Sequence, residues 1–189
     1  TAQRSAATGR VIHMHLFETA AQRRWADRLY PEGLLTVLDE MGLLSPRAVF
    51  AHGVHLTAPE LELLAERGCS VVANVSSNFR LSSGVTPLEE WDRSRVPVAI
   101  GLDGMALDDD LDMWRELRLV RGLWQAQRRC AVAAEDVLAA ATAGGIAGLG
   151  SAAPEPLRVG GRADFVVHEL SRWSAVAREA GWSAAELVL

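Results

Sequence analysis

The sequence predicts an α/β fold in which helices cover a parallel sheet, as in a (β/α) barrel. Short apolar runs alternate with helix-like segments from Val11 to about Gln127, and this order implies parallel strands joined by right-handed crossovers. Three of the runs end at or near a residue that can bind a metal or move a proton, namely His15, His52 and Asp103. Because barrel enzymes build their active sites at the carboxyl ends of the strands, these residues indicate a catalytic rim.

The predicted strands are apolar runs and do not alternate cleanly, which is typical of a parallel sheet covered by helices. They are Val11–Leu16, Ala48–His52, Ser70–Asn74 and Val96–Leu102. The predicted helices connect or follow these strands and span Gln22–Met41 (with a break near Pro31–Gly33), Pro59–Arg67, Thr86–Arg93, Met113–Gln127 and Ala134–Ala143. The pattern amounts to four β-α units and one further helix.

Local signals indicate where several helices begin and end. Thr57 and Glu60 form a capping box with a proline in the first turn, and Gly68 after the same helix suits a left-handed stop. Thr1–Arg10 reads as the tail of a helix that leads into the first strand. The pair Gly144-Gly145 is expected to close the last helix.

A connector is expected after the last helix. It is marked by Pro154, Pro156, Gly160 and Gly161 and is followed by an isolated strand-like run, Phe165–His168. The sequence has no internal repeat beyond the β-α alternation and no low-complexity segment.

Composition and charge argue against several classes of protein. The 189 residues are 49% hydrophobic and 23% charged, as in an ordinary globular protein. The net charge of -5 argues against nucleic acid as a partner, because phosphate binding needs a basic face. Since no apolar stretch approaches a membrane span and no leader-like run opens the chain, we expect no membrane partner and a cytoplasmic location.

His15 and Glu18 are the first pair of candidate site residues. Side chains alternate along a strand, so His13 and His15 should face the same way, with His15 nearer the rim. Glu18 falls just after the strand, where the chain can turn its carboxylate toward the same place. The pair suits a metal ligand and a proton shuttle, and the alternative is a core histidine beside a surface glutamate.

Two further strand ends carry candidate residues. His52 closes an apolar strand, where it can contact a substrate or a metal-bound water, and His55 in the following loop has a weaker claim to ligand contact. Asp103 follows another apolar strand and would be desolvated unless a metal or hydrogen bonds compensate its charge. The alternative for Asp103 is a turn aspartate before Gly104.

Two polar clusters are interpreted mainly as structural. Asp108, Asp109, Asp110 and Asp112 lack the spacing of a calcium loop and are expected to cap and decorate the helix that follows them. The segment Asn74–Asn78 is expected to fix the loop after the third strand through local hydrogen bonds. Ligand contact by one member of either cluster is the second interpretation.

Other catalytic templates are absent from the sequence, among them the Gly-x-Ser-x-Gly elbow, the phosphate-binding loop and the His-Glu-x-x-His motif. Four parallel strands cannot close a barrel, and an open half leaves two unpaired edges and an uncovered inner face. We therefore expect this chain to be part of a larger folding unit.

Five motifs in order give the chain a resemblance to a known family. They are His15-Leu-Phe-Glu18-Thr, Ala51-His-Gly-Val-His-Leu, Asn74-Val-Ser-Ser-Asn78, Ser83-Gly84-Val-Thr-Pro87 and Gly101-Leu-Asp103-Gly104. Together they resemble the amidohydrolase superfamily, in the branch that holds the cytosine, guanine and S-adenosylhomocysteine deaminases and the triazine chlorohydrolases. The resemblance covers nearly the whole chain, and the ordered combination is specific although no single motif is.

The resemblance implies the C-terminal half of a (β/α)8 TIM-type barrel, strands five to eight, within residues 1–150. Residues 151–189 would form a connector and a return segment toward a small β-domain, because Gly161-Arg-Ala-Asp-Phe-Val-Val resembles the family's return to that domain. The implied partner is the N-terminal half of the barrel, which carries the family's first-strand His-x-His. A homo-oligomer is left open.

The resemblance also implies a role for each candidate residue. His15 would be the strand-five metal ligand, and Asp103 the strand-eight ligand and proton acceptor. Glu18 would shuttle a proton to a ring nitrogen of the substrate. His52 would lie on strand six beside the metal-bound water or the substrate, and His52, His55 and Asn78 would contact the substrate. The implied cofactor is one divalent metal ion, zinc or iron.

The implied reaction is hydrolytic deamination of an aromatic or heterocyclic amine, such as a purine, pterin or triazine, by a metal-activated water. Two alternatives stay open: a hydrolase of the same fold with another leaving group (chloride or a cyclic amide), and a truncated, non-catalytic half-barrel. His13-Met-His15 has the family's first-strand spacing, but its neighbours in sequence place it at strand five. Val75 replaces the family's usual proline, and Met105–Asp110 replaces its more common loop. The chain by itself is expected to be inactive.

Overall fold

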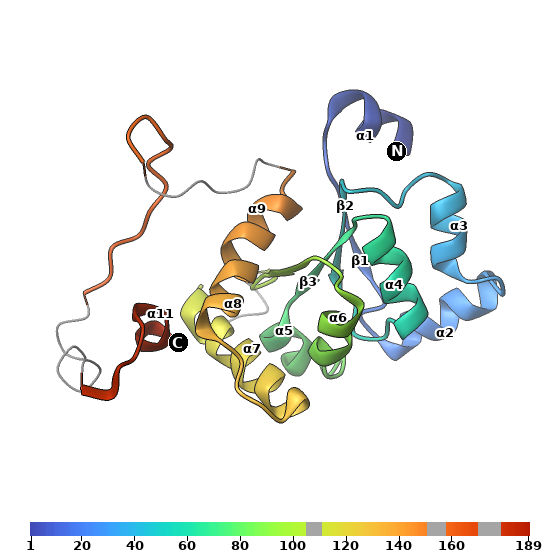
Figure 1. The fold of residues 1–189 in the computed structure, drawn as a ribbon. Helices are drawn as coiled ribbons and strands as arrows, with labels where there is room; N and C mark the ends of the chain where they lie inside the picture. The colour runs from blue at the N-terminus through green and yellow to red at the C-terminus, as the bar shows by residue number, and fades with distance from the viewer. Residues whose placement is uncertain (105–110, 151–157, 170–178) are drawn as a thin grey trace.

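The computed structural model describes residues 1–104, 111–150, 158–169 and 179–189. Four parallel strands form one sheet in the order β1-β2-β3-β4 (Figure 1). The strands are β1 (Ile12–Leu16), β2 (Ala48–His52), β3 (Ser70–Ala73) and β4 (Val98–Ile100). The α/β class and the parallel sheet predicted from the sequence are confirmed.

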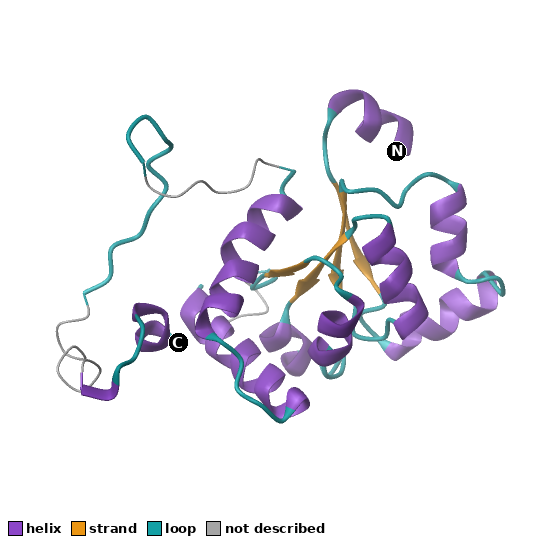
Figure 2. Cartoon of the chain, in the orientation of Figure 1, coloured by secondary structure: helices purple, strands orange, loops and turns teal. Residues whose placement is uncertain are grey.

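Helices precede, connect and follow the strands (Figure 2). They are α1 (Ala2–Thr8), α2 (Ala20–Leu29), α3 (Leu34–Glu40), α4 (Ala58–Glu66), α5 (Val75–Arg80), α6 (Leu88–Ser94), α7 (Met113–Arg128), α8 (Ala134–Ala139), the π-helical turn η1 (Ala140–Gly144), α9 (Gly145–Gly148) and α11 (Ala184–Val188). Among the described residues, no helix combines the length and the apolar character that crossing a membrane requires.

Three of the predicted helix boundaries are confirmed. The break near Pro31–Gly33 separates α2 from α3. The capping box at α4 is present, with the Glu60 carboxylate accepting a hydrogen bond from the Thr57 amide at 2.8 Å. Gly68 follows α4 in the left-handed conformation, with φ of 68°, as the sequence indicated.

Two sequence-based interpretations of irregular segments are wrong. Asn74–Asn78 does not form a loop; Asn74 precedes α5, and the other four residues lie within that helix. The strand-like run Phe165–His168 does not pair with any strand of the described sheet and is not part of a strand. A strand needs a partner to satisfy its backbone groups, so apolar character alone did not determine the structure there. Pro154 and Pro156 of the predicted connector lie outside the described residues.

The helix that starts at Ala134 does not stop at Gly144-Gly145, contrary to the prediction. It passes through the π-helical turn η1 and continues as α9 to Gly148. A Cβ atom at position 144 would collide with the carbonyl oxygen of Val98 in β4. The glycine therefore lets the helix backbone approach the sheet closely and does not end the helix.

We expect Gly144→Ala to lower the free energy of unfolding by about 1–3 kcal/mol, because the added methyl group overpacks the contact with β4. Gly122→Ala is the matched control, since Gly122 lies inside α7 with open space around its missing Cβ. It should raise the free energy of unfolding by about 0.5–1 kcal/mol. Denaturant titration measures the free energy of unfolding of both variants. A change of the same sign in the two variants would contradict the close packing of Gly144 against β4.

The two faces of the sheet have different surroundings. One face contributes Phe50, Val71 and Ala73 to the buried core, which α4 and α6 complete with residues such as Leu61 and Trp91. The other face lines an open cavity of about 440 Å³ bounded by η1 and α9, and the residues of that face that line it are His13, Val49, Val72 and Ala99. This second face is apolar and only partly covered by the described residues.

Cys69 lies in the core just before β3, whereas Cys130 is exposed. Burial raises the pKa of the Cys69 thiol from its ordinary 9.0 to about 11. Between these two values the thiol keeps its proton in the folded state and loses it in the unfolded state. The stability that the buried thiol contributes is therefore fully present below pH 9 and is lost as the pH rises toward 11. At pH 8 a thiol reagent should label Cys130 alone in the folded chain, and Cys69 only after denaturation. Equal labelling rates would contradict this burial.

Candidate functional site

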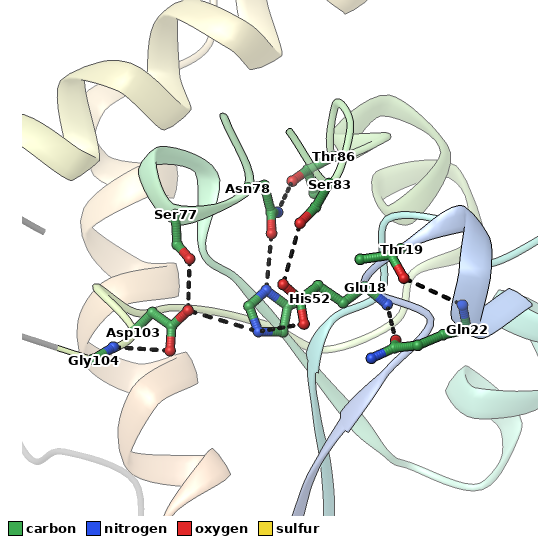
Figure 3. Close-up of polar contacts among 10 residues, drawn as sticks. All are labelled: Glu18, Thr19, Gln22, His52, Ser77, Asn78, Ser83, Thr86, Asp103 and Gly104. Carbon is green, nitrogen blue, oxygen red and sulfur yellow. Dashed lines mark hydrogen bonds and ion pairs between the residues drawn. The ribbon is translucent and has the colours of Figure 1, made fainter. Parts of the chain in front are cut away.

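Four of the candidate residues gather at one end of the sheet. Figure 3 shows three of them, Glu18, His52 and Asp103. His15 lies in β1 opposite Ala51 of β2, and His52 is the last residue of β2. Glu18 follows the end of β1, and Asp103 follows the end of β4. Because the strands are parallel, their carboxyl ends bring these side chains to the same edge of the sheet.

The backbone at this edge is unusual at each of the three strand ends that carry candidates. Phe17, His52 and Asp103 all have left-handed φ values, of 47°, 73° and 69°. Such values are uncommon for residues other than glycine, above all for a bulky aromatic side chain. Strained positions of this kind cluster at active sites, where the surrounding contacts hold them in place.

The His52 imidazole is 1% exposed and is held by one neighbour. Its Nδ1 lies 2.8 Å from the amide oxygen of Asn78, and the Asn78 amide nitrogen donates to the Thr86 hydroxyl at 2.9 Å. With the amide oriented in this way, Nδ1 carries the proton and Nε2 of the neutral ring presents a lone pair. Asn78 therefore orients His52, so that Nε2 faces the open side of the cluster.

Two carboxylates face the Nε2 atom of His52 without bonding to it. It lies 3.9 Å from Oε2 of Glu18 and 3.8 Å from Oδ2 of Asp103, and both distances are too long for a hydrogen bond. A lone pair between two carboxylates is unfavourable unless something positive or a hydrogen-bond donor lies among them. The arrangement suits a cation, or a water that donates to one of these groups.

Three of the four site residues, His15, Glu18 and His52, fit a divalent metal ion. Ligand atoms of His15, Glu18 and His52 all lie within 4.8 Å of one another, and the His15 and His52 rings are in edge contact with centroids 4.9 Å apart. Imidazole nitrogen and carboxylate oxygen are ligands that zinc accepts. The donor set therefore has the chemistry and the spacing that a zinc-type ion needs.

Both carboxylates are oriented by hydroxyl groups. The Ser77 hydroxyl donates to Oδ2 of Asp103 at 2.6 Å, and the Gly104 amide donates to Oδ1 at 2.8 Å. The Ser83 hydroxyl donates to Oε1 of Glu18 at 3.1 Å. Each carboxylate oxygen with one donor keeps a further lone pair, so these contacts orient the carboxylates without saturating them.

The remaining predicted residues lie outside this cluster. The His55 ring nitrogen Nε2 faces the Ser83 carbonyl oxygen at 3.0 Å, so its hydrogen bond joins two loops. His13 lines the cavity on the open face of the sheet. Asp112 accepts a hydrogen bond from the Arg115 amide at 3.2 Å and precedes α7, as expected of a helix cap. Asp108, Asp109 and Asp110 lie outside the described residues.

Arg23 of α2 holds the loops that follow β1 and β2. Its guanidinium lies 4.8 Å from the centre of the Phe17 ring, pairs with Glu60 at 2.7 Å and donates to the His55 carbonyl oxygen at 3.4 Å. Burial lowers the pKa of Arg23, but the hydrogen bonds that its guanidinium donates to Asp27 and Glu60 outweigh this effect and leave that pKa raised. The contacts tie Phe17, and with it the backbone before Glu18, to the rest of the rim.

Sequence reasoning missed several residues that support the site. Ser77, Ser83 and Thr86 each contact a candidate side chain or its partner, and Glu116 is a fully buried carboxylate behind α5. Ser77 and Ser83 fall within two of the five family motifs, but nothing in their spacing indicated which side chains they contact. Glu116 lies in an ordinary amphipathic helix, so the sequence carried no signal for it.

The chain belongs to the amidohydrolase family, whose profile matches residues 2–184. It is 41% identical over 164 residues to a 5-methylthioadenosine/S-adenosylhomocysteine deaminase of Natronomonas pharaonis, a match that covers 84% of this chain and 37% of the relative. The family that the five motifs indicated is therefore confirmed.

Two solved structures have similar folds. An adenosine deaminase from Xanthomonas campestris with bound zinc matches with a TM-score of 0.73 and 37% identity, over 78% of this chain and 34% of its own. The guanine deaminase of E. coli matches with a TM-score of 0.80 and 27% identity, over 99% of this chain and 45% of its own. The chain thus spans less than half the length of each of these relatives.

Proposed function

We propose that this chain supplies the metal-binding and proton-transfer half of a hydrolase that deaminates a heterocyclic amine. The observation that carries the proposal is the convergence of His15, Glu18, His52 and Asp103 at the carboxyl edge of the sheet. Relatives whose names describe deaminases of adenosine-type compounds and of guanine support the reaction type. Adenosine-type amines are therefore the first substrates to test.

The four strands correspond in this proposal to strands five to eight of a (β/α)8 barrel, within residues 1–150. The apolar face that borders the 440 Å³ cavity supports this, because a barrel interior is filled by side chains from all eight strands. The match to less than half of each relative's length also fits half a barrel. Residues 151–189 would connect this half to a small β-domain.

His15 and Asp103 would hold one divalent ion, with Glu18 and His52 beside it. A zinc-type ion bound there would make water acidic enough to ionise near neutral pH. Zinc in the Xanthomonas campestris relative favours that metal. Two ligands do not complete a tetrahedral site, so the remaining ligands would come from the strands that complete the barrel.

The side chains of this cluster suit the proton transfers of a deamination. Asp103 would accept the proton of the attacking water, because each of its oxygens has one donor and a free lone pair. Glu18 would pass a proton to the substrate ring, while Ser83 keeps its carboxylate oriented. His52 would accept a hydrogen bond at Nε2 from the water or substrate. Water adds its oxygen to the carbon, and the amino group leaves as ammonia.

A chimera tests the proposal. The part of the Natronomonas pharaonis relative that this chain does not match is joined to the chain, and ammonia release is measured with 5′-methylthioadenosine, adenosine, guanine and cytosine. The chimera should release ammonia from at least one amine, whereas the 189-residue chain alone should not. The relative itself is the positive control. If a folded, zinc-loaded chimera releases no ammonia but releases chloride or opens a cyclic amide, a hydrolase with that leaving group would replace this proposal.

A further inference from the structure

Helix α7 presents two polar side chains to the segment that supports the candidate site. Glu116 and Gln127 are eleven residues apart in the helix, about three turns at 3.6 residues per turn, so they lie on the same face. Glu116 is fully buried, and Gln127 is partly buried. The hydrogen bonds of these two side chains go to residues that support the site and not to the four site residues themselves.

Glu116 fixes the beginning of α5. Its Oε1 accepts a hydrogen bond from the Ser76 amide at 3.1 Å. The next two residues of the helix are Ser77, which donates to Asp103, and Asn78, which orients His52. One hydrogen bond from α7 therefore holds the short helix that carries both contacts.

Gln127 is linked to the His52 imidazole through a second series of hydrogen bonds. Its side-chain amide donates to the Thr86 carbonyl oxygen at 2.8 Å and accepts from the Glu89 amide at 3.1 Å. The Thr86 hydroxyl accepts from the amide nitrogen of Asn78, the contact that fixes which Asn78 atom faces His52. Both routes from α7 end at Asn78.

The burial of the Glu116 carboxylate costs folding free energy. Its Oε2 and the nearby Ser76 hydroxyl have no hydrogen-bond partner among the described residues, although both are buried. A buried carboxylate with an unsatisfied oxygen costs free energy that a leucine of similar size would avoid. The hydrogen bond of Oε1 to α5 is the one specific contact that leucine could not make.

We propose that Glu116 and Gln127 are positioning residues, which set the orientation of His52 and Asp103 through α5 and Thr86. This inference rests on the proposed function in one respect: the orientation of His52 and Asp103 affects turnover only if these residues take part in the deamination. The hydrogen-bond geometry itself stands without it.

NMR spectroscopy of the zinc-free chimera tests the proposal without metal or substrate. Nitrogen shifts of the His52 ring report which nitrogen carries the proton, and amide exchange reports the hydrogen bonds of Ser76 and Asn78. In Glu116→Leu we expect exchange at both amides to rise at least tenfold and the His52 ring to populate both tautomers. Glu116→Gln keeps an oxygen acceptor for Ser76 and should restore the wild-type spectrum.

Leu38→Ala is the control for general destabilisation, because Leu38 is buried in α3, and the hydrogen bonds that link α7 to α5 and Thr86 do not involve α3. Wild-type ring shifts in a folded Glu116→Leu, or the same changes in Leu38→Ala, would overturn the proposal. If Glu116→Leu does not fold, Gln127→Leu is tested in its place. We expect both His52 tautomers to be populated in this variant, and wild-type ring nitrogen shifts would overturn the proposal. A failed deaminase assay leaves these readouts unaffected, so the two proposals can fail separately.

Discussion

Replacing Asp103 with asparagine should reduce ammonia release by the chimera by at least about 10²–10⁴-fold, the usual contribution of a general acid or base. The asparagine amide can still accept the Ser77 hydrogen bond, so the local structure should persist. It cannot accept a proton from water, and it is a weaker metal ligand than a carboxylate. Steady-state assays at saturating zinc separate the loss of proton transfer from the loss of metal.

Asp92→Asn is the matched control for Asp103→Asn. Asp92 lies in α6, where its carboxylate pairs with Arg128 at 3.5 Å on the surface. Surface pairs of this kind contribute at most about 1 kcal/mol, so activity should stay within a factor of two or so of the parent chimera. Turnover close to the parent in Asp103→Asn would remove this carboxylate from the mechanism.

Replacing His15 with alanine should weaken zinc binding by the chimera more than about 100-fold. Changes to residues that merely support a metal ligand already cost about 10–100-fold in affinity, and loss of the ligand itself should cost more. The ring of His15 is one of the three groups whose ligand atoms lie within 4.8 Å of one another. Competition titration with a chromophoric chelator measures the change.

His13→Ala provides a close control, because His13 lies two residues earlier in β1 and borders the cavity below the cluster. Its replacement should leave zinc affinity nearly unchanged. Equal losses in the two variants would mean that the ion lies elsewhere, or that either histidine of the strand can serve. If only His13→Ala lost zinc affinity, His13 and not His15 would be the metal ligand in β1.

The strand ends were predictable from the sequence because they depend on local patterns. Apolar runs with abrupt polar ends gave β1, β2 and β4 to within a few residues, and with them the positions of His15, His52 and Asp103. A parallel arrangement then requires all carboxyl ends to lie at one edge. The family followed from the order of five short motifs, and its profile match confirms it.

Other features depend on contacts between segments far apart in sequence. Ser77 and Asp103 are 26 residues apart, and Ser83 and Glu18 are 65 residues apart, so no local pattern could pair them. The helical state of α5 was missed for the same reason, since its first turn is fixed by Glu116 of α7.

The sequence by itself determined the α/β class, the family and the residues at the strand ends. The tertiary structure alone decided how those residues are oriented, through hydroxyl and amide partners and through left-handed backbone at Phe17, His52 and Asp103. It also decided that the glycines at 144 and 145 continue a helix, and that Gly144 lets this helix approach β4 closely. Local propensity selects elements, whereas the orientation of a side chain depends on the particular neighbours that folding brings to it.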